Sequence, residues 1–264
     1  MANNIKDRQD ILTKLNIHAL HPMQEEAIEV IEKNTNTILL SPTGTGKTLA
    51  FLLPLITVLD PEVDEIQALI VVPSRELAIQ IEQVLRTMGT GFKVNAVYGG
   101  RTMTKDKIEI KHTPAILIGT PGRILDHFAN ERFSTKHIKT LILDEFDKSL
   151  EIGFEFEMKG ILAELPHINK RVLTSATSGV EIPSFVRLDQ PVIINYLKEK
   201  KALKLEVRTV VSPKNNKSHT LLELIQHLGN QQAIVFCNLK DSIEYLSTFL
   251  TKNKISHSCF SGGM

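Results

Sequence analysis

The residues with the clearest chemical potential form one short loop between an apolar run and a helical pattern. They read Ser41-Pro42-Thr43-Gly44-Thr45-Gly46-Lys47-Thr48. Glycines at 44 and 46 let the main chain curl until successive N–H groups point inward, and the start of the following helix adds a partial positive charge. Lys47 can then reach the outer phosphates of a nucleotide, and the Thr48 hydroxyl can bind Mg²⁺. The loop therefore predicts a nucleotide site.

The structural alternative is a glycine turn that caps a helix, with Lys47 in solvent. A Gly-Lys-Thr triplet alone would leave this alternative open. A strand pattern at residues 37–40 before the loop and an amphipathic pattern after it favour nucleotide binding. The loop departs from the usual form in one respect, because Ser41 stands where the first glycine is usual.

Three acids follow a second apolar run, residues 140–143. They are Asp144, Glu145 and Asp147. Burying a carboxylate without a partner is costly, so the acids need partners. If this strand lies beside the loop, Asp144 faces Thr48 and its metal, and Glu145 can orient and deprotonate an attacking water. The alternative is an acidic helix start, where carboxylates meet the helix dipole favourably.

Short β-branched runs alternate with amphipathic segments through most of the chain. The predicted strands are residues 37–40, 68–72, 94–98, 115–118, 140–143, 171–174 and 192–195, and helical patterns cover 23–32, 48–59, 75–88 and 155–165. This alternation predicts an α/β fold with a parallel sheet flanked by helices. Ligands of such sheets bind outside the carboxyl ends of the strands, which is where the loop and the acids lie.

Composition limits the remaining possibilities. The 264 residues are 42% hydrophobic and 23% charged, which suits one large domain, or one domain and part of a second. A net charge of +1 neither demands nor excludes a nucleic acid, since a local basic stripe can hide in a neutral total. The longest apolar run, residues 49–59, contains Pro54 and is too short to span a bilayer. Two cysteines without metal-site spacing favour a reduced, cytoplasmic protein.

Residues 197–205 form a charged stretch that predicts a linker. After it the alternation begins again, with strand patterns at 207–211, 232–237 and 256–260 and helical patterns at 219–228 and 241–251. These patterns predict the beginning of a second α/β unit.

Several motifs in order resemble those of the DEAD-box family of ATP-dependent RNA helicases. They are Gln24, Pro73-Ser74-Arg75-Glu76-Leu77-Ala78, Gly99-Gly100, Thr120-Pro121-Gly122-Arg123, Asp144-Glu145-Phe146-Asp147, Ser175-Ala176-Thr177 and Ile234-Val235-Phe236-Cys237-Asn238. The resemblance implies a P-loop, RecA-like first domain at 1–196, a linker at 197–205 and an incomplete second RecA-like domain at 206–264. It also implies ATP and Mg²⁺ as cofactors, with Lys47, Asp144 and Glu145 as catalytic residues.

The family's adenine-reading glutamine corresponds to Gln24, whose amide can donate and accept at once. An ordinary polar residue at a helix start is the alternative. In the same way, the resemblance implies RNA contacts, in chain order, from Pro73, Arg75, Gly99, Gly100, Thr120, Gly122 and Arg123, where arginines and glycines suit close approach of phosphates. Ordinary loop chemistry is the alternative there. Aromatics are only 5% of the chain, so we expect recognition of the RNA backbone with little sequence preference.

Asp147 is expected to accept hydrogen bonds from the Ser175 and Thr177 hydroxyls, which would couple the nucleotide site to domain movement. A plain Ser/Thr loop is the alternative. Two residues depart from the family: Phe146 replaces an alanine, and Ile17 stands where an aromatic usually stacks on adenine. Weaker nucleotide binding, or a looser preference for adenine, is the expected consequence of Ile17.

In the family, arginines of the second domain complete the ATP site, and losing such an arginine costs about 10³ to 10⁵ in turnover. We therefore expect a chain that binds ATP or ADP with Mg²⁺, and binds RNA, but barely hydrolyses ATP or unwinds RNA by itself. We also expect it to be a monomer that does not associate with a membrane. A nucleotide-gated RNA clamp and a DNA-directed translocase of the wider superfamily are the alternative functions.

Overall fold

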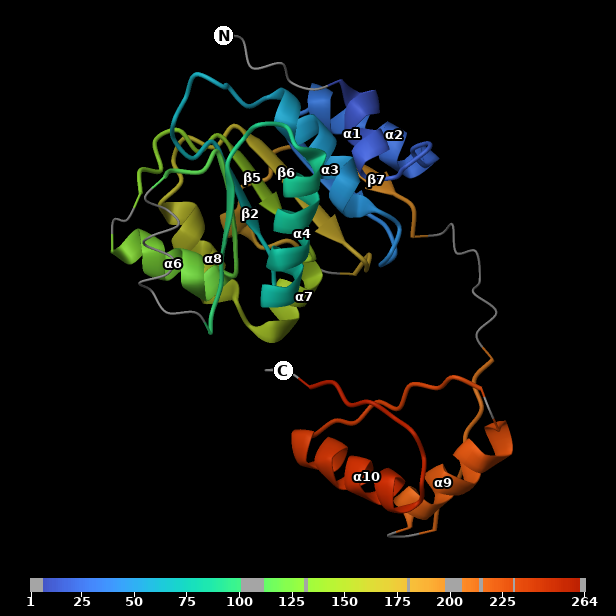
Figure 1. The fold of residues 1–264 in the computed structure, drawn as a ribbon. Coiled ribbons are helices and arrows are strands. Elements are labelled where there is room, and N and C mark those ends of the chain that lie inside the picture. The colour runs from blue at the N-terminus through green and yellow to red at the C-terminus, as the bar shows by residue number, and fades with distance from the viewer. Residues whose placement is uncertain are drawn as a thin grey trace. The chain divides into compact units, whose positions relative to one another are not determined.

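The computed structural model describes residues 7–100, 112–130, 133–179, 181–197, 206–213, 216–229 and 231–261. These residues fall into two compact units, Met1–Lys201 and Ala202–Met264 (Figure 1). All but the first residue of the predicted linker at 197–205 lie outside the described residues. The domain boundaries stay predictions.

A seven-stranded sheet forms the centre of the first unit. Its strands are β1 (Asn36–Leu40), β2 (Ala68–Val71), β3 (Val94–Val97), β4 (Ile116–Gly119), β5 (Thr140–Leu143), β6 (Lys170–Ser175) and β7 (Val192–Asn195). They lie in the order β3-β4-β2-β5-β6-β1-β7, and every pair is parallel. The predicted parallel α/β fold is confirmed, and each strand predicted in this unit is present with its ends displaced by about one residue.

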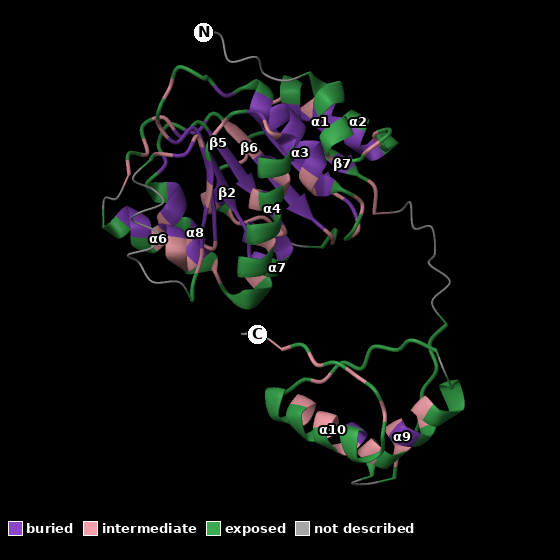
Figure 2. Cartoon of the chain, viewed as in Figure 1, coloured by how far each residue is buried: buried purple, intermediate pink, exposed green. Residues whose placement is uncertain are grey.

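Helices cover both faces of the sheet (Figure 1). One face packs against α1 (Arg8–Lys14), α2 (Pro22–Lys33), α3 (Lys47–Thr57) and α4 (Arg75–Met88). The other packs against α6 (Pro121–Ala129), α7 (Phe146–Ile152), α8 (Glu155–Ala163) and a 3-10 turn, η1 (Ser184–Val186). Because both faces are covered, the central strands are buried along their whole length, as Figure 2 shows. That double burial explains why they read as continuous apolar runs rather than alternating ones.

Local signals fix the helix ends next to the sheet edge. The Ser74 hydroxyl accepts the Leu77 N–H at 3.2 Å and caps α4, which ends at Gly89 with φ +58°. At the start of α2, Pro22 occupies the first turn and Gln24 accepts the His21 N–H at 2.9 Å. These caps set where α4 and α2 begin relative to the loops that precede them.

The second unit contains α9 (Lys217–Leu228) and α10 (Lys240–Lys252). The strands predicted at 207–211, 232–237 and 256–260 are wrong, since the described residues there form no strand. Large apolar side chains in these runs are exposed, including Val211 at 88% and Phe236 at 89%. A β-branched run becomes a strand only where neighbouring strands take its hydrogen bonds and its side chains find a surface to pack on. The assignment of this unit as a second RecA-like domain stays a prediction.

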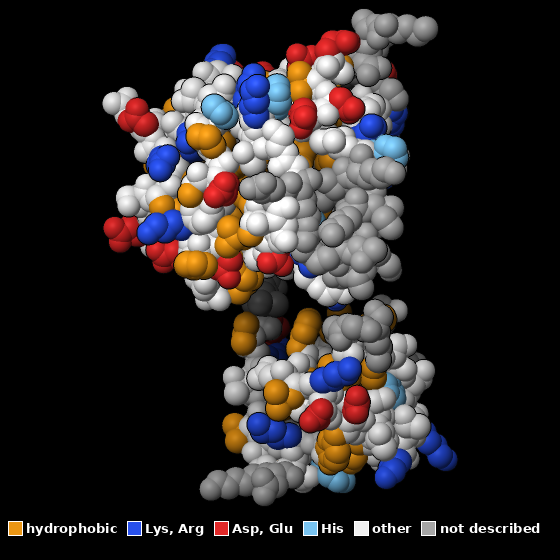
Figure 3. All heavy atoms as spheres, turned by 90° about the vertical axis from the view of Figure 1, so that its left-hand side faces the viewer, with side chains coloured by type: hydrophobic (Ala, Val, Ile, Leu, Met, Phe, Trp, Pro, Cys, Tyr) orange, Lys and Arg blue, Asp and Glu red, His pale blue; other side chains and the backbone are white. Residues whose placement is uncertain are grey.

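No helix within the described ranges is both long and apolar enough to cross a membrane. On the face seen in Figure 3, side chains of both charge signs are interspersed rather than gathered in one patch. An anionic partner would therefore depend on particular residues at the sheet edge, and not on a broad basic surface of that face.

Candidate functional site

The predicted site residues follow the carboxyl ends of six neighbouring strands. The glycine pair follows β3, Thr120 follows β4, and the Pro73 motif follows β2. The acids follow β5, Ser175-Thr177 ends β6, and the phosphate loop follows β1. The sheet order thus separates the candidate RNA residues on one half of the edge from the candidate nucleotide residues on the other.

The strand that carries the acids is not the direct neighbour of the strand that carries the loop. The sequence left open whether the two strands are neighbours, and in the structure β6 lies between β5 and β1. Pairing partners of parallel strands are set by the packing of the whole sheet, and the motif spacing alone does not contain them. The end of β6 is therefore the element that touches both sides: the Ser175 carbonyl accepts the Ser41 N–H at 3.0 Å.

The phosphate loop is closed around its own lysine. Gly44 and Gly46 have φ of +82° and +83°, a region that only glycine adopts readily. Lys47 is buried, and its Nζ donates to the main-chain carbonyls of Ser41 at 2.6 Å and Pro42 at 3.2 Å. Thr45 Oγ1 donates to the same Pro42 carbonyl at 2.8 Å. The ammonium group is thus held inside the curl of the loop.

The charges of the acids affect the lysine of the phosphate loop. Burial lowers the pKa of Lys47, while the charges of Asp144, Glu145 and Asp147 act on it in the opposite direction. These carboxylates are therefore close enough to interact with the lysine across the intervening strand β6. The two predicted halves of the nucleotide site share one place at the sheet edge.

Asp144 is almost completely buried at the end of β5. Burial raises its pKa to about 6, against the hydrogen bond from the Thr174 hydroxyl, which lowers it. The Glu145 N–H also donates to this carboxylate, at 3.1 Å. Both hydrogen bonds from the described residues end on Oδ1. Oδ2 is the oxygen that remains for a cation.

Glu145 has an unusual main-chain conformation. Its φ is +49°, which is rare outside glycine, and it occupies the N-cap of α7. Besides its bond to Asp144, its N–H lies 3.1 Å from the Thr174 hydroxyl oxygen, which accepts it. The Glu145 carboxylate accepts a hydrogen bond from Lys148 Nζ at 3.0 Å.

Asp147 contacts the end of β6. Its Oδ2 accepts the Thr177 hydroxyl at 3.0 Å and the Ala176 N–H at 3.1 Å. The Ser175 hydroxyl has its shortest bond to the Thr177 carbonyl, at 2.8 Å, and lies near the same carboxylate. Burial raises the pKa of Asp147, but hydrogen bonds from this segment and from main-chain N–H groups outweigh it, so the pKa is lowered. A lowered pKa keeps this acid ionised and bound to the segment.

Gln24 packs directly over the loop. Its Nε2 donates to the Gly46 carbonyl at 3.0 Å, and a Cβ added at Gly46 would lie 2.4 Å from that nitrogen. The glutamine side chain is 5% exposed. Each half of its amide can form one further hydrogen bond, which is what an adenine edge requires.

Among the candidate RNA residues, Arg75 is the one with the most informative contacts. It begins α4, its Nε pairs with Glu76 at 2.9 Å, and its Nη1 would lie 3.7 Å from a Cβ at Gly100. The segments after β2 and β3 therefore meet. Thr120 occupies the N-cap position of α6 without a side-chain cap bond, and its N–H donates to the Val97 carbonyl at 3.2 Å, so a second helix begins at this half of the edge.

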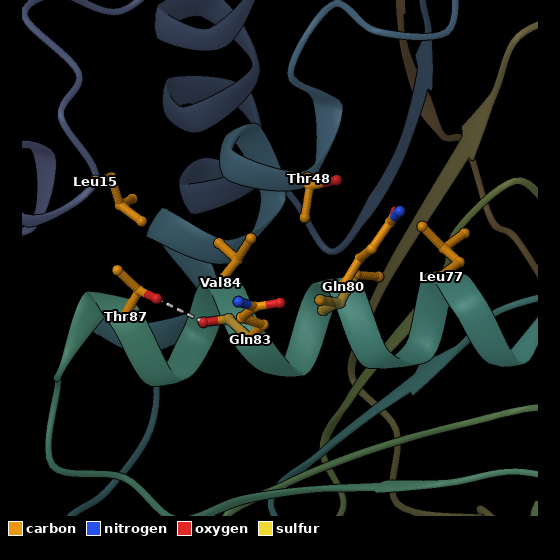
Figure 4. Close-up of a pocket in the computed structure, with 8 residues that line it drawn as sticks. Leu15, Thr48, Leu77, Gln80, Gln83, Val84 and Thr87 are labelled. Carbon is orange, nitrogen blue, oxygen red and sulfur yellow. Dashed lines mark hydrogen bonds between the residues drawn. The ribbon is translucent and has the colours of Figure 1, made fainter. Parts of the chain in front are cut away.

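A pocket of about 430 Å³ lies between the end of α1 and α4 (Figure 4). It is lined by Leu15, Thr48, Leu77, Gln80, Ile81, Gln83, Val84 and Thr87. Thr48 is the one residue that this pocket shares with the phosphate loop, and Figure 4 shows it facing α4 from above. The pocket is therefore a neighbour of the candidate site and does not contain its acids.

Comparison with known proteins decides the family. The family model for the DEAD/DEAH box helicase matches residues 21–184. The chain is a member of the DEAD/DEAH box helicase family. It is 35% identical to the ATP-dependent RNA helicase DHH1 of Saccharomyces cerevisiae (strain YJM789) over 90% of this chain and 48% of the helicase. For the DHH1 proteins of Eremothecium gossypii and Vanderwaltozyma polyspora the identities are 33% and 34%, each over 90% of this chain and 50% of the relative. The chain spans about half the length of these relatives.

The two departures from the DEAD-box pattern have structural surroundings. Phe146 is 3% exposed and lies in the apolar cluster under α6 and α8, so its ring is accommodated in the core. Ile17 packs partly buried against the opposite cluster. The phenylalanine therefore fills core space beside the acids and is not exposed at the edge.

Sequence reasoning missed two residues of this candidate site. Thr174 holds both Asp144 and the Glu145 N–H, and Lys148 holds the Glu145 carboxylate. A signal for Lys148 was present, because residues three apart on a helix are neighbours. Thr174 had no comparable signal, since its role depends on β6 lying next to β5.

Proposed function

We propose that this chain is the ATP- and RNA-binding part of a DEAD-box RNA helicase that separates short RNA duplexes at the expense of ATP. One observation carries the proposal: the end of β6 joins the phosphate loop to the acids, because the Ser175 carbonyl accepts the Ser41 N–H at 3.0 Å and Asp147 accepts the Thr177 hydroxyl at 3.0 Å. An acidic helix start without a nucleotide role would not need to share one strand end with the loop that carries Lys47. The printed names of the relatives, ATP-dependent RNA helicases, point the same way.

The residues that would hold the nucleotide come from three segments. The N–H groups of residues 41–48 would bind phosphates, Lys47 would supply positive charge, and Gln24 would bind adenine. Thr48 and Asp144 Oδ2 would bind Mg²⁺, which uses few protein ligands beside phosphates and water. No group of three His, Cys, Asp or Glu side chains suited to a metal occurs in the described part of the chain, which fits such a sparse ligand set. Bound Mg²⁺ would supply charge neutralisation at the phosphates.

Hydrolysis would use Glu145 as the base. A water oxygen attacks the γ-phosphorus, the bond from that phosphorus to the bridging oxygen breaks, and the water proton passes to the Glu145 carboxylate. Glu145 is suited to this role because its main chain is fixed on both sides while its side chain is partly exposed at 18%. Asp147, bound to Thr177, would couple these events to the rest of the protein.

RNA would bind along the other half of the edge. The candidates are Pro73, Arg75, Gly99, Gly100, Thr120, Gly122 and Arg123. Two helices, α4 and α6, begin there, and helix N-termini favour phosphate groups. The approach of Arg75 to Gly100 supports a continuous backbone-binding path from β2 to β3.

The nucleotide half is tested by titration of fluorescent mant-ADP in the presence of Mg²⁺. We expect saturable binding that is lost in Lys47→Met and kept in the control Lys33→Met, whose ammonium pairs with Glu29 on the surface. Because we expect slow turnover, single-turnover ATP hydrolysis with RNA, with DNA and without polymer, beside Glu145→Gln, then separates the functions. RNA-stimulated hydrolysis that Glu145→Gln abolishes supports the helicase; stimulation by DNA alone selects the translocase. The expectation that the 264-residue chain alone turns over slowly stays a prediction, which an ordinary helicase rate would contradict.

The RNA half is tested by fluorescence anisotropy of a labelled single-stranded RNA over a range of salt concentrations. Arg75→Gln should weaken binding equally for different sequences and lower the salt slope by about 1. Arg86→Gln is the matched control, because Arg86 lies at the other end of α4 and pairs with Glu82 as Arg75 pairs with Glu76. Equal effects of the two substitutions would contradict the assigned RNA path.

A further inference from the structure

Lys148 is a charged residue at the candidate site to which the proposed function gives no role. It lies one turn into α7, and its Nζ donates to Glu145 Oε2 at 3.0 Å. The hydrogen bond to Glu145 raises the pKa of Lys148. The ammonium group is therefore present at neutral pH and is bound to the acid that the proposed function makes the base.

The charge of Lys148 also acts on the phosphate loop. Its charge lowers the pKa of Lys47, opposite in sign to the effect of the three carboxylates. Lys148 is half-exposed, so its long side chain can turn without disturbing the core.

The main chain of Glu145 leaves its carboxylate only side-chain freedom. The N–H is fixed by Asp144 and Thr174, and the backbone is held at φ +49°. Movement is therefore restricted to the side-chain torsions of Glu145. A carboxylate oxygen bound to Lys148 cannot at the same time take up a position fixed by a water beside the phosphate loop, so the two interactions compete.

We propose that Lys148 is a positioning residue that holds the Glu145 side chain in an inactive orientation until nucleotide binds. The proposal rests on the assignment of Glu145 as the base. A nucleotide phosphate in the loop offers the Lys148 ammonium a stronger anionic partner than a single carboxylate. Exchange of Lys148 from Glu145 to phosphate frees the base at the moment when its substrate is present.

The size of the effect follows from the kind of ion pair. Exposed pairs of this type shift a two-state population by about 1.4- to 5-fold. A substitution that removes the ammonium group should therefore raise the fraction of free Glu145 by that factor, and the hydrolysis step with it. A pair that only stabilises the short helix α7 would change the unfolding midpoint and leave the rate unchanged.

Single-turnover hydrolysis of ATP with protein in excess tests this directly. We expect Lys148→Gln to hydrolyse bound ATP about 1.4- to 5-fold faster than the unsubstituted chain. The affinity of the Lys148→Gln variant for mant-ADP should not fall by more than the same factor, because the substitution is expected to change the rate constant of hydrolysis and not nucleotide binding. Lys148→Arg keeps the ion pair and should restore the original rate. Lys33→Gln, which breaks the exposed Lys33–Glu29 pair on α2, is the matched control and should change nothing.

A second measurement does not depend on turnover. In NMR spectra of protein with ¹⁵N-labelled lysine, the Lys148 ammonium signal should shift in Glu145→Gln and on addition of a non-hydrolysable ATP analogue with Mg²⁺. An unchanged signal with the analogue bound would overturn the proposal, as would a Lys148→Gln rate equal to or below the original. Two other results would contradict the proposed function itself: no nucleotide binding by the unsubstituted chain, or ATP hydrolysis by Glu145→Gln as fast as by the unsubstituted chain. Failure of the Lys148 proposal is therefore distinguishable from failure of the proposed function.

Discussion

Replacing the buried acid Asp144 by asparagine should stabilise the first unit at neutral pH. Burial raises the pKa of Asp144 to about 6 from an ordinary value of 3.8. Between these values the native state binds more protons than the unfolded state, so stability falls as the pH rises through this range. Above pH 6 the full cost of the buried charge is present, at about 3 kcal/mol. The asparagine side chain of the variant would have no charge to bury, and its amide oxygen can still accept the Thr174 hydroxyl.

We expect Asp144→Asn to gain about 1–3 kcal/mol in the free energy of unfolding at pH 7.5, and a melting temperature higher by about 2–12 °C. Thermal and urea unfolding should be measured in EDTA without nucleotide, because a bound cation would favour the ionised aspartate. At pH 4 the native aspartate is protonated and the unfolded one is partly so, and the gain should shrink toward zero.

Asp147→Asn is the matched control with the opposite sign. The pKa of Asp147 is lowered, so its carboxylate adds stability above the unfolded pKa, and that stability is lost as the pH falls through the folded pKa. Its asparagine variant should be less stable at pH 7.5. The reasoning is refuted if Asp144→Asn is no more stable than the original at pH 7.5, or if its gain is the same at pH 4 and 7.5.

Four other substitutions test contacts of the first unit, three of them around this site. Gly46→Ala would place a Cβ at φ +83° and 2.4 Å from the Gln24 amide nitrogen, and it should abolish mant-ADP binding. Gly44→Ala, at φ +82°, meets no atom within 4 Å and should lower the free energy of unfolding, measured in urea, only by the backbone strain of about 1–2 kcal/mol. Thr174→Val removes the donor to the buried carboxylate described above and should destabilise the unit by about 1–3 kcal/mol at pH 7.5, with less effect at pH 4. Tyr196→Phe removes the hydroxyl that donates to Glu26 at 2.5 Å, and it should lower the free energy of unfolding by about 0.5–1.5 kcal/mol in urea. An unchanged urea midpoint would show that this exposed hydrogen bond adds no stability.

The strands of the first unit could be predicted because their physical signal is local. Runs such as residues 68–71 and 140–143 are apolar on both faces, and each is followed by polar loop residues. The carboxyl-edge position of Lys47 and Asp144 follows from the strand-to-loop order alone. In the second unit the same local signal failed at residues 232–237, where exposed side chains show that no neighbouring strand covers the run.

Contacts between strands could not be predicted from spacing. The position of β6 between β5 and β1 determines that Thr174 meets Asp144 and that Ser175 meets the phosphate loop. Neither contact has a sequence period, because it depends on which strands pair. The hold of Lys148 on Glu145 is local, yet it depends on the left-handed conformation of Glu145 that begins α7.

The placement of β6 gives the coupling hypothesis a physical path. The loop and the acids are separated by one strand, and the end of that strand bonds to both: the Ser175 carbonyl to the Ser41 N–H, and the Thr177 hydroxyl to Asp147. A displacement of the phosphate loop or of Asp147 must therefore move the residues at the end of β6 or break these hydrogen bonds. The short side chains of Ser175 and Thr177 suit this position because their hydroxyls reach the main chain and the acid without filling the edge. A change in this segment therefore acts on two sides of the proposed nucleotide site at once, whereas a change in the loop acts on one.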